Sequence, residues 1–245
     1  MASVIQLENV CKVLGDRQVL RGMSFEVEEG NTFVIMGGSG GGKSVTLKHI
    51  IGLMKQDSGS VRVEGEEVST LDRDGLMRLR RGMGYLFQSA ALINWLTVYE
   101  NVALPLREHY SYTELEIRER VTEALATVEM EHAAELHPDR ISGGMKKRAG
   151  LARTLVTDPK IILYDEPNAG LDPVMSETVN RIILSVQRKL GVTSVVVTHR
   201  RACAFSVADV IALIDAGHVV EQGAPDQMRE SKHPLVQQFL GAGVD

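Results

Sequence analysis

The stretch Gly37-Gly38-Ser39-Gly40-Gly41-Gly42-Lys43-Ser44 follows directly on residues 31–36 (NTFVIM), which are almost all apolar. It fits the pattern G-x-x-x-x-G-K-[ST] without mismatch. Glycines let the backbone curl so that several N–H groups point at phosphate oxygens. A flexible glycine turn explains neither the Lys-Ser pair nor the position after an apolar strand. The stretch therefore predicts a phosphate-binding loop between a buried strand and a helix.

Each polar residue of this loop has a chemical reason to be there. Lys43 supplies a point charge for the β- and γ-phosphates of a nucleotide, and the hydroxyl of Ser44 is a ligand for Mg²⁺. The helix that begins near Lys43 adds its positive N-terminal end. We expect residues 37–44 and Val45 to hold the phosphates of ATP with Mg²⁺.

A second acidic site follows the apolar run Ile161-Ile162-Leu163-Tyr164. At the end of such a strand, Asp165 can face the Mg²⁺ of the phosphate loop, and Glu166 can polarise an attacking water as a general base. An acidic turn after a strand is common and means little alone. Together with the phosphate loop it favours nucleotide hydrolysis.

The rest of the chain alternates between strand and helix patterns. We expect strands at 4–10, 24–28, 161–164, 193–198 and 210–214, a hairpin over 60–68, and helices at 43–53, 113–130, 143–156, 173–189, 201–207 and 233–240. No strand pattern occurs between about 89 and 156. This order predicts an α/β P-loop NTPase with a mostly parallel core sheet, an N-terminal antiparallel β-subdomain and an inserted helical subdomain. We expect one domain, 1–245, with a core of 1–88 and 157–245 and a helical subdomain of 89–156.

Composition excludes several other classes of protein. The 245 residues carry 27 basic and 32 acidic side chains, a net charge of −5, and only 4% are aromatic, which disfavours a nucleic-acid-binding surface. Cys11 and Cys203 are too few for a disulfide framework or a cysteine-rich zinc site. The N-terminus lacks the layout of a signal peptide, and no apolar run approaches the ~18 residues of a membrane span.

Further motifs make the assignment specific. Residues 141–145 (ISGGM) resemble the signature motif of the ABC-type ATPases, and lie 20 residues before Asp165 as is typical there. In the same resemblance Gln88 corresponds to the Q-loop, residues 169–172 (AGLD) to the D-loop, and His199 to the switch histidine. The resemblance extends over nearly the whole chain.

This resemblance implies a head-to-tail dimer of two copies, with ATP between the phosphate loop of one and the signature motif of the other. Ser142, Gly143 and Gly144 then form a second cradle for the γ-phosphate, at the start of a helix. By the same resemblance His199 contacts the γ-phosphate, Gln88 senses Mg²⁺ and the attacking water, and Asp172 communicates across the dimer.

A narrower resemblance concerns residues 85–92 (YLFQSAAL), residues 96–108 (LTVYENVALPLRE) and Met145. They are similar to the ATPases of Mla-type phospholipid and solvent-resistance systems. This implies a separate integral-membrane permease docked on the helical subdomain, and a position on the cytoplasmic face of the bacterial inner membrane. A small cytoplasmic regulatory subunit and a periplasmic lipid-binding subunit are further partners that it suggests. No nucleic-acid partner is expected.

Some residues depart from the family pattern. Leu14 is aliphatic where many members stack an aromatic ring on adenine, so we expect only apolar contact with the base there. Arg200 and Arg201 follow His199 where an acidic residue is usual, and two interpretations are open: they strengthen phosphate binding, or they face solvent. The cations Lys146, Lys147, Arg148 and Arg153 are interpreted first as a solvated helix face and second as phosphate contacts.

Three other functions stay open at this stage. One is an ABC ATPase of a transporter with a different substrate. Another is a non-transport ABC ATPase that acts on DNA or ribosomes, although such proteins usually carry two ATPase units or a long coiled coil. The third is a cell-division scaffold that binds ATP without turnover, against which the presence of Glu166 and His199 argues.

Overall fold

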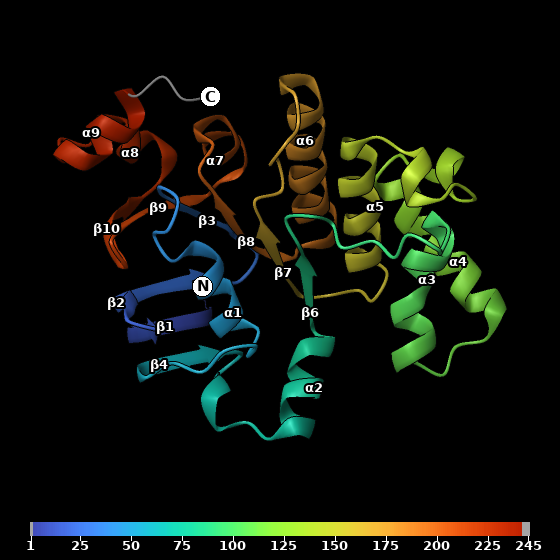
Figure 1. The fold of residues 1–245 in the computed structure, drawn as a ribbon, viewed down its shortest axis with the longest axis horizontal. Helices are drawn as coiled ribbons and strands as arrows, with labels where there is room; N and C mark the ends of the chain where they lie inside the picture. The colour runs from blue at the N-terminus through green and yellow to red at the C-terminus, as the bar shows by residue number, and fades with distance from the viewer. Residues whose placement is uncertain (1, 242–245) are drawn as a thin grey trace.

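The structure, a computed structural model, describes residues 2–241 and contains two β-sheets with helices around them (Figure 1). The larger sheet has the order β10-β9-β3-β8-β7-β6, and the smaller has the order β2-β1-β4-β5. The strands are β1 (Ser3–Leu14), β2 (Arg17–Glu28), β3 (Thr32–Met36), β4 (Ser58–Val63), β5 (Glu66–Glu67), β6 (Met83–Leu86), β7 (Ile161–Asp165), β8 (Thr193–Thr198), β9 (Val210–Asp215) and β10 (His218–Gly223). The helices are α1 (Lys43–Ile50), α2 (Arg73–Arg81), α3 (Val98–His109), α4 (Glu114–Thr127), α5 (Gly143–Leu155), α6 (Pro173–Leu190), α7 (Arg201–Val207), α8 (Pro225–Glu230) and α9 (Pro234–Gly241).

The larger sheet is parallel apart from the antiparallel pairing of β9 with β10, as the alternation of strands and helices predicted. Every residue of β3, β7 and β8 is buried. The sequences TFVIM, IILYD and TSVVVT suit such strands because both faces of a parallel sheet are covered. The carboxyl ends of β3, β8, β7 and β6 adjoin one another, and ligands bind at this edge of open α/β sheets.

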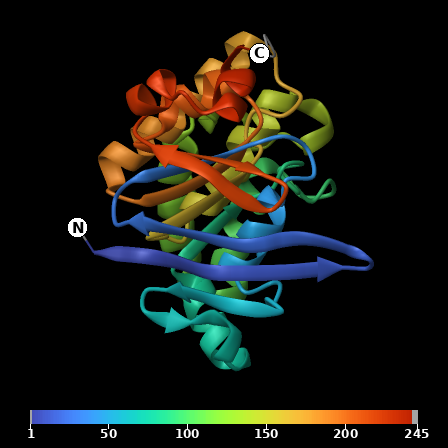
Figure 2. The same cartoon turned by 90° about the vertical axis from the view of Figure 1, so that its left-hand side faces the viewer.

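Side chains on the two faces of the larger sheet enter two separate cores. On one face Phe33 and Ile35 of β3 pack with α1 and the antiparallel sheet, and on the other Val34 and Met36 pack with the helices α3 to α7. The antiparallel sheet is dominated by the long β1–β2 hairpin, which turns at residues 15–16 (Figure 2). The fold is therefore the predicted α/β architecture with a second, antiparallel sheet.

The elements between residues 98 and 155 are helical, as expected from the sequence. Capping boxes begin two of these helices, because Thr97 pairs with Glu100 at the start of α3 and Thr113 pairs with Glu116 at the start of α4. Buried Asn101 anchors the preceding loop, since its side chain bonds both the N–H and the C=O of Ile93 at 2.7 and 3.0 Å.

Several boundaries differ from the sequence predictions. Helix α1 ends at Ile50 and not at 53, and Gly52 with a φ of 69° continues the turn that follows. Helix α4 ends at Thr127 and not at 130, because Glu129 has a φ of 58°, which no α-helical residue adopts. Strands β1 and β2 are longer than predicted, and strands β6 and β10 and helices α2 and α8 were not predicted.

Within residues 2–241 we find no helix with the length and apolarity that crossing a bilayer requires. Both cysteines carry free thiols, and Cys203 is buried in α7. Burial, with a smaller contribution from the charge of Glu166, raises the pKa of the Cys203 thiol to about 12.

Candidate nucleotide site

The phosphate loop connects β3 to α1, and its glycines are required by its shape. Gly42 has a φ of 98°, and a Cβ there would lie 2.7 Å from Cδ2 of Leu20. A Cβ on Gly37 would lie 2.4 Å from the carbonyl oxygen of Ile214. The backbone can take this path only without side chains at these two positions.

The ammonium group of Lys43 lies within the curl of the loop. Its Nζ donates to the carbonyls of Gly37 and Gly38, both at 2.9 Å, and lies 3.7 Å from the Glu166 carboxylate. Burial lowers the pKa of Lys43, and the charges of Glu166 and Asp165 oppose this shift. The site thus holds a desolvated cation beside two neutral acceptors, which suits capture of an anionic phosphate.

Hydroxyl and carboxylate oxygen atoms lie close together next to the loop. The hydroxyl of Ser44 donates to Oδ1 of Asp165 at 2.8 Å, and the hydroxyl of Tyr85 donates to Oδ2 of the same carboxylate at 3.0 Å. A carboxylate and a hydroxyl, completed by phosphate oxygens and water, make a donor set that Mg²⁺ prefers. The described residues contain no cluster of three or more acidic, histidine or cysteine ligands, so this is the oxygen set that fits the metal. The Tyr85 contact was not expected from the sequence, because β6 was not predicted.

Glu166 stands at the meeting point of three elements. Its backbone adopts a φ of 50°, unusual for a residue other than glycine, and its N–H bonds Val197 of β8 at 3.0 Å. The carboxylate of Glu166 lies 2.9 Å from Nδ1 of His199, with Lys43 on another side. Because an ionised carboxylate only accepts hydrogen bonds, Nδ1 of His199 is assigned as the donor. The side chain of Glu166 is thereby fixed between the loop lysine and the histidine.

A cavity of about 610 Å³ lies over these groups. It is lined by the predicted residues Gly38, Ser39, Gly40, Gly42, Lys43, Ser44, Val45, Gln88, Glu166 and His199, whereas Gly37, Gly41 and Asp165 do not line it. Gln88 is exposed there, and its backbone carbonyl is bonded by Lys147. Leu14 is 39% exposed and does not line the cavity, whereas Arg17 and Val19 of the same β1–β2 hairpin do. Contact of Leu14 with the base stays a prediction.

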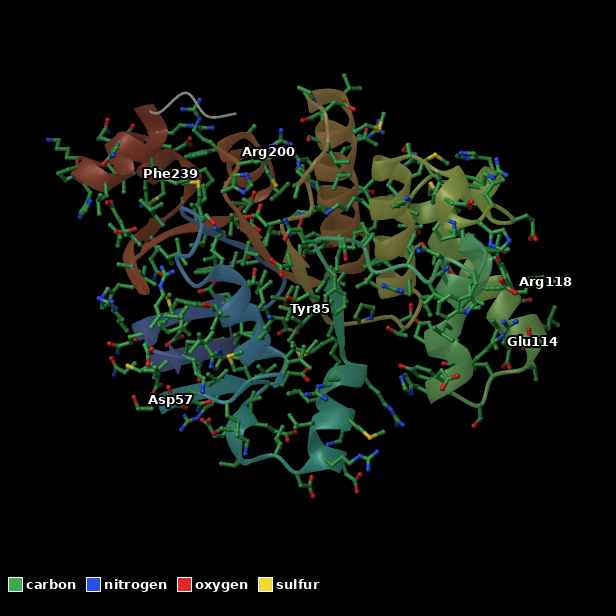
Figure 3. The ribbon with its side chains drawn as sticks, viewed as in Figure 1. Asp57, Tyr85, Glu114, Arg118, Arg200 and Phe239 are labelled. Carbon is green, nitrogen blue, oxygen red and sulfur yellow. The ribbon has the colours of Figure 1, made fainter. Side chains whose placement is uncertain are left out.

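Phe239 also lines this cavity, and nothing in the sequence singled it out (Figure 3). It belongs to α9, the C-terminal helix that the apolar spacing over 233–240 predicted. The carbonyl of Leu240 in the same helix accepts a hydrogen bond from Arg201 of α7. Arg201 therefore reaches α9, and neither interpretation of it is confirmed.

The signature and D-loop residues do not line the cavity of their own chain. Ser142 caps α5, where its Oγ accepts from the N–H of Met145 at 3.2 Å, and Gly143 and Gly144 form the first turn. Asp172 caps α6 and accepts from the N–H of Met175 at 2.9 Å. The N-termini of α5 and α6 therefore do not line this chain's own nucleotide cavity.

The basic cluster on α5 is not the solvated face that its charge run predicted. Lys147 is 6% exposed, and its Nζ bonds the carbonyls of Gln88 and Glu166, the latter at 3.2 Å. Burial lowers the pKa of Lys147. Arg148 bonds the carbonyls of Val128 and Glu129, and Arg153 bonds those of Ala90 and Ala91. These cations satisfy loop carbonyls, a contact that a charge pattern cannot predict. Lys146 is half-buried.

Arg200 takes neither position that the sequence suggested. It is half-buried, does not line the cavity, and bonds the turn before α6. Asn168, whose carbonyl Arg200 bonds, is 1% exposed, and its Nδ2 donates to Oδ1 of Asn180 at 2.8 Å.

Residues 20–169 match the family model described as ABC transporter, which is more than half of the chain. The chain belongs to the ABC transporter family. The chain is therefore an ABC ATPase, an enzyme that hydrolyses ATP with Mg²⁺.

Curated relatives confirm this family over nearly the full length. The chain is 38% identical over 240 residues to the "Probable ribonucleotide transport ATP-binding protein mkl" of Mycobacterium leprae, an alignment that covers 98% of the chain and 69% of that ABC protein. It is 36% identical over 243 residues to the "Intermembrane phospholipid transport system ATP-binding protein MlaF" of Haemophilus influenzae, an alignment that covers 99% of this chain and 92% of that protein. The names of these two relatives give different substrates, ribonucleotide and phospholipid.

A solved structure agrees with the ABC ATPase fold. The ATP-binding cassette MJ0796, described as a dimeric post-hydrolysis state bound to ADP and Pi, superposes with a TM-score of 0.83 and 34% identity. The match covers 90% of this chain and 98% of that one.

Proposed function

We propose that this ABC ATPase is the motor subunit of a transporter that moves phospholipid at the bacterial inner membrane. The observation that carries the enzymatic part is the convergence of Lys43, Glu166 and His199 over one cavity. Support for the lipid part comes from the run at residues 96–108 and from the MlaF relative, 92% of which is aligned.

In this proposal the loop holds the triphosphate and the acidic strand end holds the metal. Lys43 exchanges its two carbonyl partners for the β- and γ-phosphates, which are stronger acceptors because they are charged. Ser44 and Asp165 ligate Mg²⁺, with Gln88 as a further ligand from the cavity wall. The metal would supply charge neutralisation for the phosphoryl oxygens.

Hydrolysis then depends on Glu166 and His199. Glu166 accepts a proton from the attacking water, and its position against His199 and Lys43 restricts its rotamers. His199 donates from Nδ1 to Glu166, and its ring lies at the cavity where the γ-phosphate would bind. The bond from water to the γ-phosphorus forms as the bond to the bridging oxygen of ADP breaks.

Two copies complete the site. Ser142, Gly143 and Gly144 lie at the N-terminus of α5 and Asp172 at that of α6, and none lines its own cavity. We assign these residues to the nucleotide held by a second copy, where the helix N-terminus favours a negatively charged γ-phosphate. ATP then favours the closed dimer because each γ-phosphate contacts both copies.

A larger cavity of about 1060 Å³ is the proposed dock for a short cytoplasmic helix of the permease. Its walls come from α2, β6, α3 and α5, and include the apolar side chains Leu76, Met77, Phe87 and Leu104. Phe87 precedes Gln88, so a helix in this groove would lie next to the nucleotide cavity. Arginines at the groove outnumber its two acids, which favours a helix with a carboxylate.

The same proposal places the ATPase on the cytoplasmic side of the membrane through its permease. It includes a periplasmic lipid-binding subunit and a small cytoplasmic regulatory subunit as partners. No nucleic acid is included, since Lys147, Arg148 and Arg153 of α5 are bonded to carbonyls of the chain itself.

The test is a pull-down of the Glu166→Gln variant from native membranes with ATP and Mg²⁺. This variant is expected to retain nucleotide and slow hydrolysis, which prolongs the closed state. Co-purification of a multi-span permease with bound phospholipid supports the proposal, and wild type with ADP is the control. A permease that carries a nucleotide or another polar solute contradicts the lipid assignment. Recovery of ribosomes, DNA or division proteins without a permease contradicts the transport assignment.

A further inference from the structure

Arg200 connects two segments that the sequence separates by about thirty residues. Its Nη1 lies 3.0 Å from the carbonyl of Asn168, 3.3 Å from that of Leu171 and 2.6 Å from Oγ of Ser176. Figure 3 shows Arg200 at the start of α7. The side chain thus contacts both ends of the turn 168–171 and the first turns of α6.

The turn 168–171 connects Glu166, at the nucleotide cavity, to Asp172 at the start of α6. At one end the N–H of Ala169 donates to the carbonyl of Glu166 at 3.0 Å, and at the other Asp172 caps α6. The N–H of Leu171 bonds the carbonyl of Asn168 at 3.2 Å. Buried Asn168 in turn donates to the carbonyl of Ser176 at 3.3 Å. The position of the turn 168–171 therefore determines the position of Asp172.

Arg200 is attached just as firmly to the other segment. It directly follows His199, and its backbone N–H donates to Oγ1 of Thr198 at 3.0 Å. His199 contacts Glu166 through its ring. A displacement of His199 would therefore move Arg200, and with it the two carbonyls that the guanidinium bonds. Hydrogen bonds from a charged donor are stronger than neutral ones, which suits this transmission.

We propose that Arg200 is a positioning residue that couples the switch histidine His199 to Asp172, and so controls closure of two copies and not nucleotide binding by one. This inference rests on the proposed ATP-dependent dimer. Direct contact with phosphate is disfavoured because Arg200 does not line the cavity and its Nη1 already has three acceptors.

The first experiment measures dimer formation in the full chain carrying Glu166→Gln. Sedimentation velocity with MgATP gives the dimer dissociation constant, and titration with MgADP gives the affinity of one copy for nucleotide. Adding Arg200→Gln is expected to raise the dimer dissociation constant about tenfold or more while MgADP affinity changes less than about twofold. Arg200→Lys, which keeps the charge and three donors on a shorter side chain, is expected to restore part of the loss.

Two further variants control for indirect effects. Arg188→Gln removes an exposed arginine from α6 and is expected to leave both constants unchanged. Ser176→Ala removes one acceptor and is expected to have an intermediate effect on the dimer. Unchanged dimerisation in Arg200→Gln would overturn the proposal. A larger loss of MgADP affinity than of dimerisation would also overturn it, in favour of a nucleotide contact.

Hydrogen exchange, measured at a protein concentration below the dimer dissociation constant, provides a readout within one copy. In the Glu166→Gln background, the amides of Ala169 and Leu171 are expected to exchange differently with MgATP and with MgADP. Arg200→Gln is expected to abolish this difference, and its persistence would contradict the coupling. If Glu166→Gln alone fails to dimerise with MgATP, the proposed sandwich is wrong, and the exchange difference still decides the role of Arg200.

Discussion

The hydroxyl of Tyr85 donates a 3.0 Å hydrogen bond to Oδ2 of Asp165. Tyr85 belongs to β6, and its side chain also lines the larger groove, where its ring lies 4.4 Å from that of Phe87. Burial, followed by the charge of Asp165, raises the pKa of the Tyr85 hydroxyl, which therefore remains a donor at neutral pH. One residue thus contacts both the proposed metal ligand and the proposed permease groove.

Tyr85→Phe removes this hydrogen bond and keeps the ring. The Asp165 carboxylate loses one of its two fixed partners, so we expect apparent Mg²⁺ affinity in the presence of ADP to fall about threefold to tenfold. Binding of Mn²⁺ measured by electron paramagnetic resonance gives this affinity directly. Tyr110→Phe is the matched control, because Tyr110 lines the same groove and stacks on Tyr112. Equal Mn²⁺ binding in both variants would refute the role assigned to Tyr85.

Lys147→Met leaves the carbonyls of Gln88 and Glu166 without their shared donor. A buried acceptor without a partner destabilises a protein by about 1–3 kcal/mol, so we expect the variant to unfold at lower urea concentration. Because these carbonyls belong to two site residues, we also expect kcat to fall by about tenfold with little change in KM. Lys146→Met is the neighbouring control. A kcat equal to that of wild type would show that Lys147 does not position the site.

Gly42→Ala tests the shape of the empty loop. The positive φ of Gly42 and the contact of 2.7 Å with Leu20 predict strain, so the Tm without nucleotide is expected to fall by several degrees. A Cβ on Gly38 meets nothing within 4 Å, and that glycine has no positive φ. Gly38→Ala is therefore expected to leave the Tm unchanged. Calorimetry of both variants checks the prediction, and equal Tm values contradict it.

Cys203 predicts a specific dependence of stability on pH. Its pKa in the folded chain is raised to about 12, above the value of about 8.5 in an unfolded chain. The stabilisation is therefore complete below pH ~8.5 and is lost as the pH rises from there toward 12. Cys203→Ala should decline less steeply between pH 8.5 and 10 than wild type in urea unfolding. Identical slopes would show that this thiol does not contribute.

Local patterns were sufficient to predict the loop and the acidic strand end, and the family resemblance pointed to the histidine. In each case an apolar strand is followed directly by polar site residues. The strands are NTFVIM before the loop, IILY before Asp165 and Glu166, and TSVVVT before His199. Since the strands are parallel and adjacent, their carboxyl ends meet at one edge, and the polar residues come together.

Long-range contacts were the part that the sequence could not predict. The partner of Lys147 is a carbonyl 59 residues away, and Arg200 bonds a carbonyl 32 residues away. Charge patterns suggested solvent or phosphate for both, because a pattern along one helix carries no information about the loop that packs against it. Phe239 was missed for the same reason, since only the docking of α9 brings it to the cavity.

The central claim is that Glu166 activates water in an MgATP site. Phosphate release from [γ-³²P]ATP, measured with excess purified full-length protein, tests it in wild type and in Glu166→Gln. We expect hydrolysis in the variant to fall by about a hundredfold or more, with MgATP affinity within a few-fold of wild type. Hydrolysis at the wild-type rate in Glu166→Gln would contradict the account.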